Sequence, residues 1–251
     1  MSNNILIASL SLIFSSIFFV INDAIINYLS VNKIEFYHFI FYGIPAYIAF
    51  PIFLFIKGSL KKNLICSNYW IPLIRGLIFA PMPFITFISL KNISLPEFTT
   101  LNMSAPLVGA IYGYIFLKEK LNLFIYISLV IGFLGVIFVI QPGFDSFNIY
   151  FLVVLFGVFL ITTTTTIVNK FNNVTTTLGY FLYGGLITHI ICILLFILDP
   201  IKVSYEVFFL ITIASIFINL AIFLATFSFH KAQKHYSSIF CLVYLQIVWS
   251  S

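Results

Sequence analysis

Long apolar stretches separated by short polar connections dominate this sequence and restrict the folds open to it. A membrane-spanning helix needs about 20 predominantly apolar residues. Cutting the sequence at charged and turn-forming residues predicts nine spans, 5–28, 36–56, 70–90, 98–117, 121–140, 149–169, 178–198, 207–229 and 237–251. Only 8% of the residues are charged, whereas a soluble domain has about 25%. No soluble fold could bury this much apolar surface, so the sequence predicts an all-α polytopic membrane protein in a lipid bilayer.

The connections between these spans are short, and their lysines predict an orientation. K-G-S-L-K-K-N follows the second span and K-E-K follows the fourth, which leaves no room for a soluble domain. With the N-terminus in the cytoplasm, eight loop lysines lie inside and three lie outside, as the positive-inside rule requires. The inside set is Lys57, Lys61, Lys62, Lys118, Lys120, Lys170, Lys231 and Lys234, and the outside set is Lys33, Lys91 and Lys202. We therefore expect a cytoplasmic N-terminus and a binding site between the helices.

The sequence also resembles itself at a shift of about 140 residues. Thr86-Phe87 matches Thr226-Phe227, and Lys91 matches Lys231 in the same order. This order predicts two units, 1–143 and 144–251, each built on a pattern of five spans. An odd number of spans inverts the second unit, as in many secondary transporters with a site near the membrane midplane.

The second unit is predicted to be incomplete. The stretch 237–251 would cover only about 22 Å as a helix, which is short of a hydrocarbon core of roughly 30 Å. The first unit continues past the corresponding point into one more full span. The expectation is therefore a 5+5 inverted repeat whose last helix and a half are missing from this chain.

Several motifs resemble those of the EamA-like transporters of the drug/metabolite transporter superfamily. They are N-D-A-I-I-N-Y at the end of the first span, L-I-R-G-L at 73–77, S-A-P-L-V-G-A-I-Y-G-Y-I-F-L-K-E-K at 104–120 and I-G-F-L-G-V-I-F-V at 131–139. The part from Pro106 to Val136, with the acid Glu119, carries the most recognisable similarity. The resemblance implies a permease of the bacterial inner membrane that moves small metabolites.

Within that family the chain is most similar to the S-adenosylmethionine uptake transporters of intracellular bacteria with reduced genomes. Members of this group end the first span with N-D-x-I-x-K-Y and begin the third with R-G. Here Asn27 stands in place of the lysine, whereas the second copy has Lys170 after Asn169. The resemblance implies S-adenosylmethionine as a candidate substrate.

Other kinds of site have little support in the sequence. Cys66, Cys192 and Cys241 are far apart and have neither CxxC nor Cys/His spacing, so neither a metal site nor a disulfide is predicted. The basic residues are not clustered with aromatic residues, which argues against nucleic acid. We expect no cofactor, and the predicted partners are a small-molecule substrate and the lipid bilayer, with the oligomeric state left open.

Asp23 is the leading candidate for a substrate contact. On a helical projection the Ser, Asn and Asp residues of 5–30 fall within one arc of about 160°. The members of this arc are Ser9, Ser11, Ser15, Ser16, Asn22, Asp23, Asn27 and Ser30. An acid inside a span is a functional hypothesis by default, and the alternative is hydration near the outer interface. We expect Asp23, Asn22 and Asn27 to face other helices or water.

Two further candidates carry a charge or can gain one. Arg75, the only arginine, could pair with a substrate carboxylate, or its side chain could extend to the cytoplasmic interface. His189 lies in the middle of a span, where it could relay protons or simply hydrogen-bond a neighbouring helix.

The remaining candidates are uncharged. Asn102 and Asn219 could hydrogen-bond a substrate or join two helices. Tyr180 and Tyr183 lie on one helix face and could stack on a flat ligand or pack against other side chains.

Three motifs are interpreted as structural. Pro81 and Pro83 should break the third span, and the hydroxyls of Thr162–Thr166 should bond backbone carbonyls one turn earlier and bend their helix. Gly109 and Gly113 form a G-x-x-x-G pattern that lets helices approach closely.

The sequence therefore favours a secondary transporter of a small polar metabolite, which is not an enzyme. S-adenosylmethionine uptake and export of an amino acid or another amine are alternatives within the family. A membrane enzyme acting on lipid-linked substrates is a third possibility, although the seven acids are scattered. An inactive fragment is a fourth.

Overall fold

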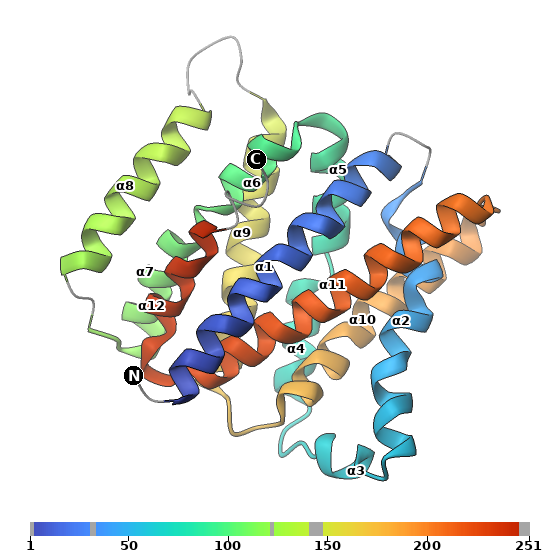
Figure 1. Cartoon of the computed structure of the whole chain (residues 1–251), viewed down its shortest axis with the longest axis horizontal. Coiled ribbons are helices and arrows are strands. Elements are labelled where there is room, and N and C mark those ends of the chain that lie inside the picture. The colour runs from blue at the N-terminus through green and yellow to red at the C-terminus, as the bar shows by residue number, and fades with distance from the viewer. Residues whose placement is uncertain (1–2, 31–33, 121–122, 141–147, 246–251) are drawn as a thin grey trace.

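The computed structural model describes residues 3–30, 34–120, 123–140 and 148–245, and these residues form a bundle of helices (Figure 1). The first group is α1 (Asn3–Ser30), α2 (Phe36–Ile56), α3 (Leu60–Asn63), α4 (Trp70–Phe79), α5 (Met82–Asn92), α6 (Leu95–Asn102), α7 (Ala105–Leu117) and α8 (Leu123–Ile140). The second group is α9 (Ile149–Lys170), α10 (Thr177–Leu198), α11 (Tyr205–Ala232) and α12 (Tyr236–Phe240), with short 3-10 helices at Gln233–His235 and Cys241–Leu245.

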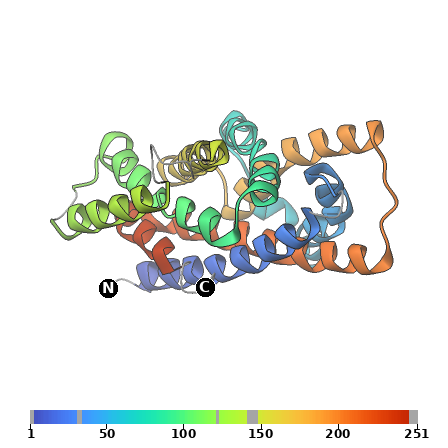
Figure 2. The same cartoon turned by 90° about the horizontal axis from the view of Figure 1, so that it is seen from above.

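Seven helical segments are long and apolar enough to cross a membrane: Asn4–Leu29, Phe36–Phe53, Trp70–Asn92, Leu95–Leu117, Ile149–Lys170, Thr177–Leu198 and Tyr205–Ala232. They coincide with seven of the nine predicted spans and confirm a polytopic membrane protein. The predicted span 121–140 corresponds to α8, which lies at the edge of the bundle in both views (Figures 1 and 2). The predicted span 237–251 begins as α12 and a 3-10 helix, and its last residues lie outside the described part of the chain.

Two spans are interrupted, and prolines lie at both interruptions. The third consists of α4 and α5, separated at Ala80-Pro81, which confirms the predicted break. The fourth was predicted as one helix but consists of α6 and α7, because Pro106 has no N–H to donate one turn back.

Helices α1 and α11 pack side by side along most of their lengths (Figures 1 and 2). The Ser15 hydroxyl donates to the Ala221 carbonyl at 2.8 Å, and the rings of Phe18 and Phe217 lie 5.4 Å apart. The residue numbers rise along α1 while those of their partners in α11 fall, so the two helices are antiparallel. This pairing sets the depth at which residues of α1 and α11 face each other.

The connections lie at the two ends of the bundle as the predicted topology requires. At one end, the Ser67 N–H donates to the Val174 carbonyl at 2.9 Å, joining the connections after α3 and α9. At the other end, the Tyr37 hydroxyl donates to Asp199 Oδ2 at 2.5 Å. Residues predicted on the same side of the membrane therefore lie together, while the orientation itself stays a prediction.

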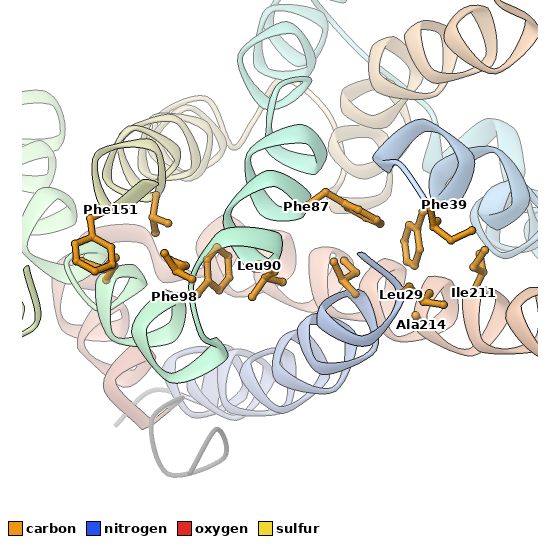
Figure 3. Packing of buried hydrophobic residues seen from close by; sticks show 13 residues of the cluster. Leu29, Phe39, Phe87, Leu90, Phe98, Phe151, Ile211 and Ala214 are labelled. Carbon is orange, nitrogen blue, oxygen red and sulfur yellow. The ribbon is translucent and has the colours of Figure 1, made fainter. Parts of the chain in front are cut away.

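Buried apolar side chains form a core toward each end of the bundle. Figure 3 shows the first, in which Leu29, Phe87 and Ile211 bring α1, α5 and α11 together. The second includes Leu12 of α1 and Phe229 of α11. The space between the two cores is the site described below.

The small-residue motif makes the predicted close approach and the threonine hydroxyls make the predicted backbone hydrogen bonds, while the bend of α9 stays a prediction. A Cβ on Gly113 would lie 2.3 Å from Ser237 Oγ, and one on Gly109 would lie 2.6 Å from the Phe240 ring, so α7 approaches α12 closely. Within α9, the Thr166 hydroxyl donates to the Thr162 carbonyl at 2.8 Å. The helix is nevertheless continuous from Ile149 to Lys170.

Candidate functional site

A cavity of about 210 Å³ lies between the helices and takes lining residues from both apolar cores. One face of α1 lines it with Leu12, Ser15, Ser16, Phe19, Asn22, Asp23 and Ile26. The facing stripe of α11 contributes Ser215, Ile218, Asn219, Ile222, Ala225 and Phe229. Both sets follow the spacing of three and four residues that marks one side of a helix. The structure thus places four members of the polar arc of α1 on the cavity, Ser15, Ser16, Asn22 and Asp23.

Asp23 is the acid of this cavity. Its side chain is buried, and Asn22 Nδ2 donates to its Oδ1 at 3.1 Å. Among the described residues, no lysine, arginine or histidine forms an ion pair with it. Burial of a carboxylate without a positive partner is costly. The arrangement is therefore suited to a ligand that brings the missing positive charge.

Arg75 lines the same cavity but is not the partner of Asp23. It is buried; its Nη1 donates to the Tyr180 carbonyl at 2.9 Å and its Nη2 to Thr226 Oγ1 at 3.2 Å. Its Nε has no partner within the described chain. The guanidinium does not extend to the interface as the alternative interpretation supposed, because these bonds hold it between α4, α10 and α11.

His189 lines the cavity beside Tyr47, an aromatic residue that the sequence reasoning did not single out. The two rings stack with centroids 3.9 Å apart, and His189 Nδ1 lies 2.8 Å from the Gly185 carbonyl of its own helix. Since a carbonyl only accepts, Nδ1 carries the proton and Nε2 is the acceptor when the ring is neutral. The Tyr47 hydroxyl donates to the Leu182 carbonyl, which fixes the stacking ring.

Asn102 and Asn219 also line the cavity. Asn219 Nδ2 donates to the Ser215 carbonyl of the preceding turn at 2.7 Å, so this amide group is held by its own helix rather than by a neighbour. Six of the predicted site residues therefore meet at one cavity: Asn22, Asp23, Arg75, Asn102, His189 and Asn219.

Three predicted residues lie outside the cavity lining. Asn27 Nδ2 donates to the Leu90 carbonyl at 2.9 Å. The hydroxyls of Tyr180 and Tyr183 donate to the carbonyls of Phe171 and Leu64 at 2.6 and 2.8 Å. These side chains join helices to each other and to connections, so the geometry favours the packing interpretation for both tyrosines.

Sequence reasoning missed several polar groups of the cavity. Ser215 and Thr188 are buried in its lining, and their hydroxyls have no hydrogen-bond partner among the described residues. Asn22 Oδ1 is unpartnered in the same way. Ser215 precedes Asn219 by one helical turn, and that spacing was the available signal. Unpartnered buried polar atoms are rare in folded proteins, so water or a ligand would have to satisfy those that line the cavity.

A bundle of membrane-spanning helices around a cavity that holds a buried acid and a buried arginine is an arrangement typical of membrane transporters. The model of the EamA-like transporter family matches residues 3–141. This is more than half of the chain, and the protein belongs to that family. None of the curated proteins compared with the sequence matches it.

Proposed function

We propose that this protein moves a small, positively charged polar metabolite across the membrane by alternating access. The observation that carries the proposal is the buried Asp23, which faces a cavity between helices and lacks an ion-pair partner among the described residues. An intramembrane acid of this kind marks a substrate or ion pathway. A cationic ligand would pair with the Asp23 carboxylate while it is bound and would carry its positive charge away on release.

The packing of the helices supports two inverted units, 1–143 and 144–251. Under the sequence repeat, α1 corresponds to α9, α2 to α10, and the α4–α5 pair to α11. The observed contact of α1 with α11 then corresponds to the contact of α9 with α5. The contact of α2 with α11 corresponds likewise to that of α10 with α4. The family match at 3–141 covers almost the same residues as the first proposed unit.

Alternating access follows from this arrangement. The cavity is lined by α1 and α2 of the first unit and by α10 and α11 of the second. If the two units rock against each other, the cavity opens to one side of the membrane at a time. The proposed setting is the bacterial inner membrane, with the N-terminus in the cytoplasm.

S-adenosylmethionine is the candidate substrate that the sequence resemblance supports. It carries positive charge for Asp23, and its flat base could stack on a ring. Phe19, Phe39 and Phe87 line the cavity and offer such faces. Export of an amino acid or another amine is the competing proposal, because the same acid and rings would serve it.

The decisive experiment is transport by proteoliposomes or by cells that produce the protein. Labelled S-adenosylmethionine and a labelled amine are supplied in parallel, and accumulation is compared with a vector control. Movement of the amine without any movement of S-adenosylmethionine would eliminate the specific assignment.

Replacing Asp23 tests whether this acid binds the positive charge of the substrate. Asp23→Asn keeps the shape but removes the charge, so transport of a cationic substrate should fall by about tenfold or more, equivalent to losing one charge-assisted hydrogen bond. Glu206→Gln is the matched control, since that acid is exposed in the first turn of α11. Unchanged transport in Asp23→Asn would remove Asp23 from the mechanism.

A further inference from the structure

Ser215 of α11 lies at the same depth as Asn22 and Asp23 of α1. The Ser15–Ala221 hydrogen bond and the Phe18–Phe217 contact fix the antiparallel register of the two helices. Seven residues along α1 from Ser15 lead to Asn22, and six residues back along α11 from Ala221 lead to Ser215. At the helical rise these steps are about 10 Å and 9 Å. All three side chains line the cavity and are at least nine-tenths buried.

The hydrogen-bond directions leave mainly acceptors for a ligand at this depth. Asn22 directs its NH₂ group to Asp23, and the reverse orientation would bring an oxygen against the carboxylate. Asn219 must donate to the Ser215 carbonyl, since a carbonyl cannot donate. At this depth, the groups without partners among the described residues are Asn22 Oδ1 and Ser215 Oγ, and both residues line the same cavity as Asp23.

Gly43 of α2 provides the space around Ser215. A Cβ at Gly43 would lie 2.3 Å from Ser215 Oγ, so any larger residue would force the hydroxyl to move. Gly43 itself lines the cavity. The position of Ser215 thus depends on a close approach between α2 and α11.

We propose that Asp23, Asn22 and Ser215 form a binding site for a protonated primary amine and accept hydrogen bonds from its N–H groups. This assignment deepens the proposed function by naming the group that the cavity recognises, and it introduces Ser215 as a specificity-determining residue. A primary ammonium has three N–H donors and matches a carboxylate, an amide oxygen and a hydroxyl. A quaternary ammonium or a sulfonium has the charge but no N–H, and it leaves both neutral acceptors unpaired. If S-adenosylmethionine is the substrate, the site takes its α-ammonium group and not its sulfonium.

Binding to the purified full chain in detergent tests the proposal without requiring transport. The probes are 2-phenylethylamine and its N,N,N-trimethyl analogue, which has the same charge but no N–H. A ligand that binds the folded state raises the thermal midpoint, and the rise at a given concentration is larger for the ligand with the lower Kd. We expect the primary amine to stabilise the protein and the trimethyl analogue to bind at least about threefold more weakly, since neutral acceptors stay unpaired.

Single substitutions distinguish the loss of a hydrogen-bond acceptor from a general change in packing. Ser215→Ala should weaken the primary amine by about 3- to 10-fold, the equivalent of one hydrogen bond, and leave the trimethyl analogue within about twofold. Asp23→Asn should weaken both probes. Ser128→Ala is the control, because that serine lies on α8 outside the cavity and donates to its own helix at Phe124.

The outcomes are distinguishable from failure of the proposed function. Equal binding of the two amines, no binding of the primary amine, or an unaffected Ser215→Ala would each overturn the amine site, whatever the protein transports. Stabilisation by sodium chloride but not by choline chloride, with the same loss in Ser215→Ala, would assign these oxygens to an inorganic cation and also overturn it. If the protein binds the primary amine more tightly than its trimethyl analogue but transports nothing measurable, the amine site stands. Only the transporter proposal is then contradicted.

Discussion

At the scale of single residues, Arg75 shows how burial separates two interpretations of one sequence position. From the sequence, a lone arginine near the start of a span is either an interfacial group or a ligand clamp. In the structure it is 5% exposed, and two of its nitrogens donate to Tyr180 and Thr226. Part of its role is therefore to join α4 to α10 and α11, while its Nε has no hydrogen-bond partner among the described residues.

Replacement of Arg75 should reduce stability even without substrate. Arg75→Ala removes two hydrogen bonds from a charged donor, so we expect a loss of about 1.5–3 kcal/mol in the free energy of unfolding. Arg75→Lys should lose less but not be neutral, because an ammonium cannot reproduce the planar fork of the guanidinium. Thermal unfolding in detergent measures both, with exposed Lys62→Ala as the control. Wild-type stability of Arg75→Ala would show that the two bonds contribute nothing.

At the scale of elements, the contact between α4 and α10 depends on glycine. A Cβ on Gly76 would lie 2.5 Å from the Gly184 carbonyl oxygen, which is backbone and cannot rotate away. A Cβ on Gly184 would in turn lie 2.4 Å from Arg75 Nη1. The close approach of the two helices therefore positions the Arg75 hydrogen bonds.

Gly76→Ala should separate α4 from α10. Overpacking at a close contact costs about 1–3 kcal/mol, which outweighs the gain of up to about 1 kcal/mol that alanine brings to a helix. Gly135→Ala in α8 is the matched control, since no atom of the described part of the chain lies within 4 Å of its Cβ position. Thermal midpoints should fall for the first variant and stay level or rise for the second. The opposite order would contradict the close contact.

At the scale of the whole molecule, α7 and α12 join the two proposed units at one end of the bundle. Glu119 follows α7 and accepts from the N–H groups of Tyr236 and Ser237 at 2.7 and 3.0 Å. The Ser237 hydroxyl also donates to this carboxylate at 2.5 Å. Rocking of the two units would have to loosen this contact.

A disulfide across this contact should stop transport if the units rock. In a chain whose native cysteines are replaced by serine, Gly113→Cys with Ser237→Cys brings two Cβ positions to disulfide range. Oxidation should abolish substrate movement and reduction should restore it. The reduced double variant and oxidant-treated Ser237→Cys serve as controls. Full transport by the cross-linked protein would contradict rocking at this contact.

The native Cys66 offers a test of orientation. It lies partly exposed in the connection between α3 and α4, which the lysine distribution places in the cytoplasm. A membrane-impermeant maleimide should label it in inverted vesicles but not in intact cells, and Ser204→Cys in the opposite connection should show the reverse. Labelling of Cys66 from outside would invert the topology.

Much of the architecture could be predicted because its signals are local. A span of about 20 apolar residues is legible in the sequence, and Pro81 broke the third span as its missing N–H requires. The break before Pro106 was missed because the apolar run continues through it. Six of the nine candidate residues line the cavity, since their polarity is itself conspicuous in apolar helices. Tyr180 and Tyr183 do not, because whether a ring meets a ligand or a backbone carbonyl depends on its neighbours.

Local sequence patterns were enough to identify a membrane protein of many helices, to locate most of these helices, and to place Asp23 and Asn22 on one polar face. These follow from the cost of placing polar groups in lipid, which acts on each segment separately. The packing of the helices was needed to find that Asp23 lacks an ion-pair partner among the described residues, that Arg75 bonds to α10 and α11, and that Ser215 lies at the depth of Asn22. Those facts depend on the register between helices that are distant in the chain, and no local pattern encodes it.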